Sequence, residues 1–368
     1  MRNEELSAWL FEHGGPVIRY RTAAELLPPS KSINIQQLRD EMMQSPQVQK
    51  WLGNLIPPRL LLNNPTTTPH VLESGLMEIH GSKPTNLENV IGKLTDFGLK
   101  KGIPEFDQRT IPYRKWLEEN AERPTENVFD KFSVGMIASF LARAGYVQEP
   151  AVGIVLKNRL NTVYDFTRKG DFDIYVKPEK YIRHHRLIKL EVVRGEICRL
   201  PLIYDIIGWA AYLPECGTEE DLAKADNIID YILNEEYQKL PWGYGIMGDG
   251  AGRTWGLGWS VHLPGFIGSP ATKDVNKSVV QMVNLLVNFR IARQHSWFIE
   301  SLNHLEEFRT EKGTYMFPGD YLQEKPVGYW VNGVHMGLEE NRRRNLELES
   351  TFWMAKLRKI LSDYNQRT

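Results

Sequence analysis

Residues 3–27 read NEELSAWLFEHGGPVIRYRTAAELL and predict two consecutive helices. In the first half, Leu6 and Leu10 lie four residues apart, which is the spacing of one helix face. A Gly-Gly-Pro sequence at 14–16 interrupts this pattern and suits the end of one helix and the first turn of the next. We therefore expect an antiparallel helical hairpin that ends at Pro28.

Outward from this hairpin, the same helical period recurs along most of the chain. The clearest example runs from Val128 to Phe140, with apolar residues at steps of four. Strands are predicted in one region, where 171–176 and 188–193 could pair. Further helices are predicted at 34–44, 70–80, 87–100, 126–143, 151–168, 202–213, 218–233, 277–293, 296–309 and 346–363.

The number of helices suggests how they are arranged. About a dozen helices in successive hairpins would close a ring of six hairpins. An open solenoid of similar hairpins usually shows a repeat of fixed length, and this sequence shows no strict repeat. We therefore predict a single all-α domain over residues 1–368, an α/α toroid of about six helical hairpins with long aromatic-rich loops.

Composition and charge narrow the classes of function. The 368 residues carry 45 basic and 46 acidic side chains, and this balance gives no electrostatic case for binding nucleic acid. Two cysteines, Cys198 and Cys216, are too few for a disulfide framework and suit a reducing compartment. The sequence contains neither a signal-peptide core nor a run of about 20 apolar residues that could span a bilayer. A cytoplasmic protein without a membrane span is predicted.

Two long connections, 241–268 and 313–354, are rich in aromatic residues and glycine. Long loops in a compact protein usually carry function, so we expect both to line the rim of a central cavity. Aromatic faces can stabilise a cation or stack on a sugar ring, and Arg342 could bind a phosphate or carboxylate. Alternatively, the rings only pack the loops onto the helices, and 337–350 is a solvated surface. The predicted substrate-binding residues are Trp242, Tyr244, Trp255, Trp259, Tyr315, Tyr321, Tyr329, Trp330, His335 and Arg342.

Three carboxylates in these loops, Asp249, Asp320 and Glu324, are the predicted catalytic residues. Asp249 lies in GIMGDGAGR, where the glycines allow the backbone to approach a ligand closely. Neighbouring tryptophans would desolvate its carboxyl group, and desolvation raises the pKa of a carboxyl group and suits it to proton donation. The alternative is a glycine-rich turn in which Asp249 serves only as a turn former.

The sequence predicts no metal site and no organic cofactor. The pair His184 and His185 lacks the spacing that places two zinc ligands on one face. The segment GDGAG at 248–252 lacks the preceding strand and following helix of a dinucleotide-binding motif. The chain also contains neither a P-loop nor a G-x-S-x-G nucleophile elbow.

Three segments resemble bacterial proteins with the α/α toroid of the prenyltransferase and squalene-cyclase superfamily. They are WLFEHGGPVIRYRTAAELL at 9–27, SPQVQKWLGNLI at 45–56 and LELESTFWMAKLRKI at 346–360. In addition, GTYMF at 313–317 resembles a degenerate form of the Q-x-x-x-G-x-W motif that links helices in that superfamily. The resemblance implies the toroid fold and an isoprenoid-like ligand. The D-x-D-D cluster of the cyclases is matched only in part, by DFDI at 171–174.

Three functions are open from the sequence. The first is a toroid that binds a hydrophobic, isoprenoid-like molecule in an aromatic-lined cavity, with one acidic residue for proton transfer, either as an enzyme or as a non-enzymatic relative. The second is a carbohydrate-active hydrolase or lyase on the same fold, which needs two carboxylates about 5 to 10 Å apart in an open polar groove. The third is a HEAT-like helical scaffold that binds a protein partner. The long aromatic loops favour the first two.

Overall fold

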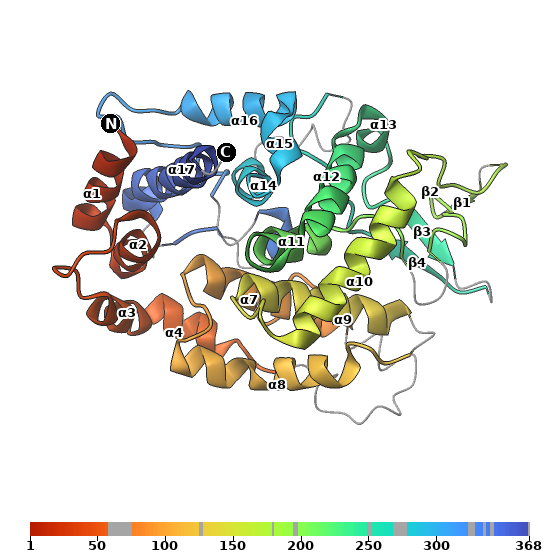
Figure 1. The fold of residues 1–368 in the computed structure, drawn as a ribbon, viewed down its shortest axis with the longest axis horizontal. Coiled ribbons are helices and arrows are strands. Elements are labelled where there is room, and N and C mark those ends of the chain that lie inside the picture. Colours follow the sequence, from red (N-terminus) through yellow and green to blue (C-terminus); the bar gives the residue numbers. More distant parts are fainter. Residues whose placement is uncertain are drawn as a thin grey trace.

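The computed structural model describes residues 1–57, 76–124, 128–178, 180–193, 198–248, 252–267, 278–322, 328–333, 336–338 and 342–366 (Figure 1). The chain is predominantly helical, which confirms the helical class predicted from the sequence, and its described strands form two short hairpins. None of the described helices is both long and apolar enough to cross a membrane. The helices are α1 (Asn3–His13), α2 (Pro16–Arg21), α3 (Ile35–Met43), α4 (Pro46–Gly53), α7 (Leu87–Asp96), α8 (Pro104–Asn120), α9 (Val128–Arg143), α10 (Pro150–Thr167), α11 (Ile203–Cys216), α12 (Glu219–Leu233), α13 (Glu235–Gln238), α14 (Val279–Leu286), α15 (Arg290–Gln294), α16 (Ser296–Glu306) and α17 (Arg342–Asn365).

The predicted N-terminal hairpin is present as α1 and α2, and α2 continues into a π-helical turn at Thr22–Leu26. The backbone N–H of Gly14 donates to the carbonyl of Leu10 at 2.9 Å and closes α1. A Cβ atom on Gly14 would lie 2.6 Å from the side chain of Ile18. Glycine at this corner therefore lets the two helices approach closely.

Other helices differ in part from the prediction. The helices α4, α8 and α13 were not predicted, and α8 contains Pro112, an interior residue that normally argues against a helix. The predicted helix 277–293 is divided into α14 and α15 at 287–289. The predicted helix 70–80 lies largely outside the described residues, and its described part is helical at 76–79.

The helices pack in a regular order. The helix α7 packs against α9, α9 against α11, α11 against α14, and α14 against α17. The helix α17 packs in turn against α1 and α2, so the first and last helices of the chain meet (Figure 1). The helices α8 and α10 pack on α9, α12 packs on α10, and α16 packs on α14. Buried hydrophobic residues from these helices form one continuous core.

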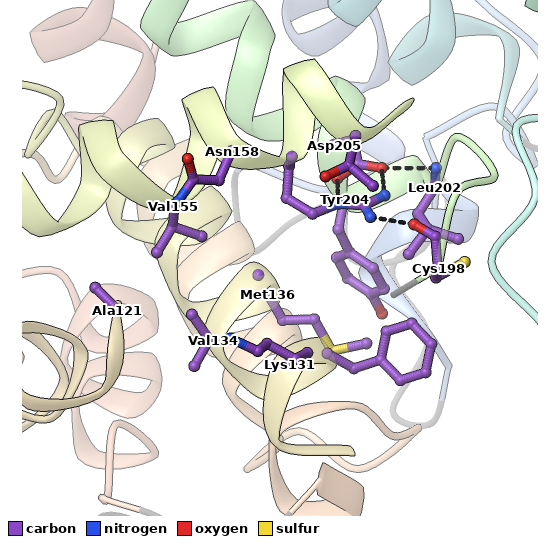
Figure 2. A pocket seen from close by; sticks show the side chains of 14 residues that line it. Ala121, Lys131, Val134, Met136, Val155, Asn158, Cys198, Leu202, Tyr204 and Asp205 are labelled. Atoms are coloured by element: carbon purple, nitrogen blue, oxygen red, sulfur yellow. Dashed lines mark hydrogen bonds and ion pairs between the residues drawn. The ribbon is translucent and has the colours of Figure 1, made fainter. Parts of the chain in front are cut away.

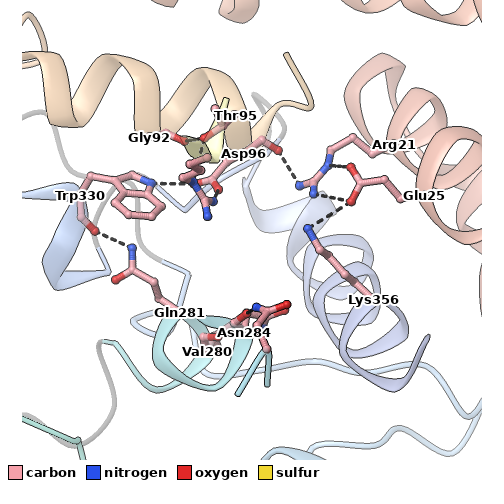
Figure 3. Close-up of polar contacts among 12 residues, drawn as sticks. Arg21, Glu25, Gly92, Thr95, Asp96, Val280, Gln281, Asn284, Trp330 and Lys356 are labelled. Carbon is pink, nitrogen blue, oxygen red and sulfur yellow. Dashed lines mark hydrogen bonds and ion pairs between the residues drawn. The ribbon is translucent and has the colours of Figure 1, made fainter. Parts of the chain in front are cut away.

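A largely buried network of charges, drawn in Figure 3, joins α2 and its π-helical turn to α7, α9 and α17. The guanidinium group of Arg21 donates to the Glu25 carboxylate at 2.7 and 2.9 Å and to the backbone carbonyl of Asp96 at 2.6 Å. The ammonium group of Lys356 pairs with Glu25 at 3.1 Å, and Arg143 pairs with the carboxylate of Asp96 at 2.6 Å. Each acid in this network therefore has a cationic partner.

The long C-terminal connection enters this interior through Trp330, which lies in a 3-10 turn at Trp330–Asn332 and is 1% exposed. Its indole N–H donates to the carboxylate of Asp96 at 2.8 Å, and its backbone N–H donates to Asn89 at 2.7 Å. Its carbonyl accepts from the amide of Gln281 at 2.7 Å (Figure 3). A Cβ atom on Gly92 would lie 2.5 Å from the indole ring, so this glycine makes room for the tryptophan. The loop is thereby fixed between α7 and α14.

The strands form two small antiparallel hairpins. One pairs β1 (Tyr181–Ile182) with β2 (His185–Arg186), and the other pairs β3 (Gly245–Gly248) with β4 (Thr254–Leu257). The predicted strands at 171–176 and 188–193 do not form, and the two segments pair only at one isolated antiparallel bridge between Tyr175 and Ile188. The strands β3 and β4 lie in a segment that was predicted as an aromatic loop.

Candidate functional site

A cavity of about 190 Å³ opens between α9, α10 and α11 (Figure 2). The helix α9 contributes Phe132 and Met136, one turn apart, together with Gly135. No atom lies within 4 Å of the position that a Cβ atom on Gly135 would take, so this glycine faces open space. Val155 of α10 and Leu202 before α11 extend this apolar part of the wall, and Asn158 and Thr162 of α10 add polar side chains to it.

An ion pair closes one side of the cavity. Arg159 of α10 donates to both carboxylate oxygens of Asp205, at 2.9 and 2.6 Å, and also to the backbone carbonyl of Leu200 at 3.3 Å. Asp205 also accepts from the backbone N–H of Leu202 at 2.9 Å, at the start of α11. Burial raises the pKa of the neighbouring Cys198 thiol to about 11, so this cysteine remains protonated at neutral pH. Because Arg159 and Asp205 neutralise each other, neither supplies a free charge to the cavity.

Tyr204 connects the cavity to a buried hydrogen-bonded chain. Its ring lines the cavity, and its hydroxyl group donates to Oε2 of Glu88 on α7 at 2.5 Å. Nδ1 of His80 lies 2.6 Å from the Tyr204 hydroxyl oxygen and 3.1 Å from Oε2 of Glu88. Glu88 is 0% exposed, so solvent does not reach its carboxyl group. We call His80, Glu88 and Tyr204 the relay.

Two of the predicted aromatic residues fix the histidine of the relay. The indole N–H of Trp259 donates to Nε2 of His80 at 3.0 Å. An indole N–H can only donate, so Nε2 carries no proton and Nδ1 is the nitrogen that donates to the relay. The ring of Tyr329 stacks on the imidazole with centroids 4.9 Å apart. The predicted loop residues Trp259 and Tyr329 therefore orient His80.

The relay holds one oxygen of Glu88 and leaves the other free. Within the described part of the chain, Oε1 of Glu88 is buried without a hydrogen-bond partner, and the carboxyl group pairs with no lysine or arginine. Burial, and next the charge of Glu88, raise the pKa of Tyr204 well above its ordinary value. The Tyr204 hydroxyl therefore keeps its proton and can act as a donor.

The other predicted aromatic residues are spread over different parts of the fold. Trp255 packs edge-on against Phe129 of α9, and Trp330 is buried against α7. Trp242 is 49% exposed and lies beside His262. None of these residues lines the cavity between α9, α10 and α11.

The remaining predicted tyrosines form hydrogen bonds of their own. The hydroxyl of Tyr244 donates to the carbonyl of Pro201, and the hydroxyl of Tyr315 donates to Glu306 at 2.6 Å. The hydroxyl of Tyr321 lies 2.7 Å from Nε2 of His304. These three residues are buried, and they do not line the cavity.

Of the three predicted catalytic acids, Asp320 lies within the described residues, and its side chain is exposed at the surface. Asp249, Glu324 and His335 lie outside the described residues, as does the side chain of Arg342. Among the residues that the structure describes, no group of three or more histidine, cysteine, aspartate or glutamate side chains could hold a metal ion.

The relay residues were not singled out from the sequence. The available signal lies in LENVIGKLTD, the sequence of α7, in which every residue is buried although Glu88, Asn89, Lys93 and Asp96 are polar. Buried polar residues on a helix need specific partners. The partner of Glu88 is 116 positions away, so the period of the helix could not identify it.

Comparison of the chain with protein-family models, with curated proteins and with solved structures found no match in any of the three. The function is therefore inferred from the residues of the site and their geometry.

Proposed function

We propose that the helices close into an α/α toroid and that the cavity beside Tyr204 binds a small, mostly apolar molecule to which the relay transfers a proton. The order of helix contacts supports the ring. It runs from α7 through α9, α11, α14 and α17 to α2, and from α2 it returns to α7 through α3 and α4.

One observation carries the proton transfer: Tyr204 both lines the cavity and donates to a buried carboxyl group at 2.5 Å. In the proposed step, Tyr204 gives its proton to the bound molecule and becomes a phenolate, and the resulting cation then loses a proton to this phenolate, which restores Tyr204. The Nδ1–H group of His80 already points at this oxygen and stabilises the negative charge that develops there. Trp259 keeps that N–H group in place.

The lining of the cavity supports an apolar molecule rather than a sugar. Phe132, Met136 and Leu202 offer no hydrogen bond to a hydroxyl group, and Asn158 and Thr162 are the two uncharged amide and hydroxyl side chains that the described lining adds to Tyr204. A sugar usually needs more polar contacts around its ring. A helical scaffold has no use for a buried relay beside a cavity, because its binding surface is the outside of the helices. The isoprenoid-like hypothesis is therefore the one that we carry forward.

Deuterium incorporation tests the proton transfer. Dimethylallyl diphosphate, geranyl diphosphate and squalene would be incubated with the protein in D₂O and analysed by mass spectrometry. We expect deuterium in at least one of these alkenes, and we expect Tyr204→Phe to reduce its rate of incorporation about 100-fold or more. The matched control is Tyr212→Phe, which removes a hydroxyl group from the same helix away from the relay.

Two results would contradict the proposal. The first is the absence of deuterium from all three alkenes in the presence of folded protein. The second is an equal loss of incorporation in both tyrosine variants, because the effect would then not belong to the relay. Binding of glucose or galacturonate in place of the alkenes, measured by thermal shift, would favour the carbohydrate hypothesis instead.

A further inference from the structure

We infer that the molecule bound in the cavity is a short amphipathic anion, whose carboxylate or phosphate head binds Lys131 and whose apolar body lies along α9 toward Tyr204. This inference rests on the proposed function, because it names the class of molecule that the same cavity takes. Three observations support it: the charge of Lys131, the apolar wall and the size of the cavity.

Among the described residues that line the cavity, Lys131 is the cation without a carboxylate partner. Its ammonium group donates to the backbone carbonyl of Arg123 at 3.2 Å, and within the described residues it pairs with no carboxylate. The other cation, Arg159, is neutralised by Asp205. A half-buried ammonium group without a counter-ion is unfavourable, so this end of the cavity favours an anion.

The two ends of the cavity have different characters. The ammonium group of Lys131 lies near the end of α8, where Ala121 lines the cavity (Figure 2). Phe132 and Met136 follow on α9, and Tyr204 lies on the far side. An anionic head at Lys131 would therefore place the apolar body between these side chains and its other end beside Tyr204.

The size of the cavity limits the length of the molecule. Its volume of about 190 Å³ is below the range of about 300 to 1,000 Å³ that holds drug-sized ligands. A chain of about six carbon atoms with a small head suits this space, whereas a long chain such as squalene does not, so dimethylallyl diphosphate is the alkene of the three that fits best.

Isothermal titration with four six-carbon probes tests this inference: hexanoate, hexyl phosphate, hexanol and hexylamine. We expect hexanoate or hexyl phosphate to bind about tenfold or more tightly than hexanol, and hexylamine to bind most weakly. Hexanoate and hexyl phosphate differ in charge and geometry, so their ratio identifies the preferred head group. Dodecanoate, which is too long for the cavity, is expected to bind more weakly than hexanoate.

Variants connect this binding to the cavity. We expect Lys131→Met to weaken hexanoate binding about tenfold or more and Lys131→Arg to retain most of it. The matched control is Lys157→Met on α10, which removes a lysine that already pairs with Asp221 at 3.4 Å. Gly135→Leu would fill the open space beside α9 and is expected to abolish binding of all four probes. Thermal unfolding of each variant shows whether it is folded.

The outcomes separate this inference from the proposed function. Equal binding of hexanol and hexanoate, unchanged by Lys131→Met but abolished by Gly135→Leu, would overturn the anionic head and leave the cavity as the binding site. Binding unaffected by Gly135→Leu would overturn both. The titrations measure binding of the probes, whereas deuterium incorporation measures proton transfer by the relay. The inference about the head group therefore stands or falls independently of deuterium incorporation.

Discussion

At the scale of single residues, α7 carries two buried carboxyl groups with opposite surroundings. Asp96 has both oxygens occupied, one by the guanidinium group of Arg143 at 2.6 Å and one by the indole N–H of Trp330 at 2.8 Å. Glu88 has one oxygen held by Tyr204 and one without a partner. The ion pair and hydrogen bond of Asp96 stabilise the fold. A buried carboxylate oxygen without a hydrogen-bond partner, as in Glu88, costs stability and is typical of residues that serve function.

This contrast predicts different effects of two isosteric substitutions. Asp96→Asn removes one member of a buried ion pair and is expected to cost about 2–4 kcal/mol of unfolding free energy. Glu88→Gln removes a buried acid that lacks a cation and is expected to leave the unfolding free energy unchanged or higher, while deuterium incorporation is lost. Urea denaturation of both variants measures the difference. A loss of stability in Glu88→Gln as large as in Asp96→Asn would mark Glu88 as a structural residue.

At the scale of elements, helices with one buried face could be predicted from the sequence, and the short strands and the relay could not. The helix α1 has the bounds that its apolar period predicts. The helix α8 was missed because of Pro112, and β3 was missed because its four residues include Gly245 and Gly248, which are poor strand formers. Of the site, the sequence named Trp259 and Tyr329 only as substrate-binding residues, and their contacts with His80 could not be predicted because the relay depends on tertiary contacts.

The connection between α13 and α14 contains Trp259, and the buried side chain of His262 stabilises it through hydrogen bonds. His262 is 3% exposed; its Nε2–H group donates to the carbonyl of Leu240 at 2.9 Å, and its Nδ1 accepts from the hydroxyl of Ser260 at 2.7 Å. Ser260 in turn accepts from the backbone N–H of Gly243 at 2.8 Å. Protonation of Nδ1 would break this arrangement, and burial lowers the pKa of His262 to about 4.

The lowered pKa predicts that mild acid destabilises the protein. The unfolded chain binds a proton at His262 near pH 6.5, and the folded chain binds it only near pH 4, so stability is complete above pH 6.5 and falls as the pH decreases toward 4. Between pH 7 and pH 5, His262 is expected to account for a loss of about 2 kcal/mol of unfolding free energy. Urea denaturation at both values, compared with His262→Gln, isolates this contribution. Parallel losses in the two proteins would show that other groups cause the acid sensitivity.

At the scale of the whole molecule, the network around Arg21 joins the beginning of the chain to its end. Arg21 bonds Glu25 and the carbonyl of Asp96, and its guanidinium group lies 4.4 Å from the centroid of the Phe352 ring on α17. The sequence predicted both terminal segments as helices, but whether they meet depends on contacts between residues more than 300 positions apart. In an open solenoid the two ends would be independent, whereas in a closed ring they stabilise each other.

Removal of this junction tests the ring. Arg21→Met leaves Glu25 with Lys356 alone and exposes the contact between α2 and α17, so amide hydrogens in α1, α2 and α17 are expected to exchange together, about 100-fold faster than in wild type. The helix α10, which packs on α9, and the helix α12, which packs on α10, are expected to change little. The matched control is Arg19→Met on the same helix, whose pair with Glu41 at 3.3 Å is partly exposed and contributes little. Faster exchange confined to α2 would contradict ring closure. In a closed ring, loss of the contact between α2 and α17 destabilises the helices on both sides of that contact.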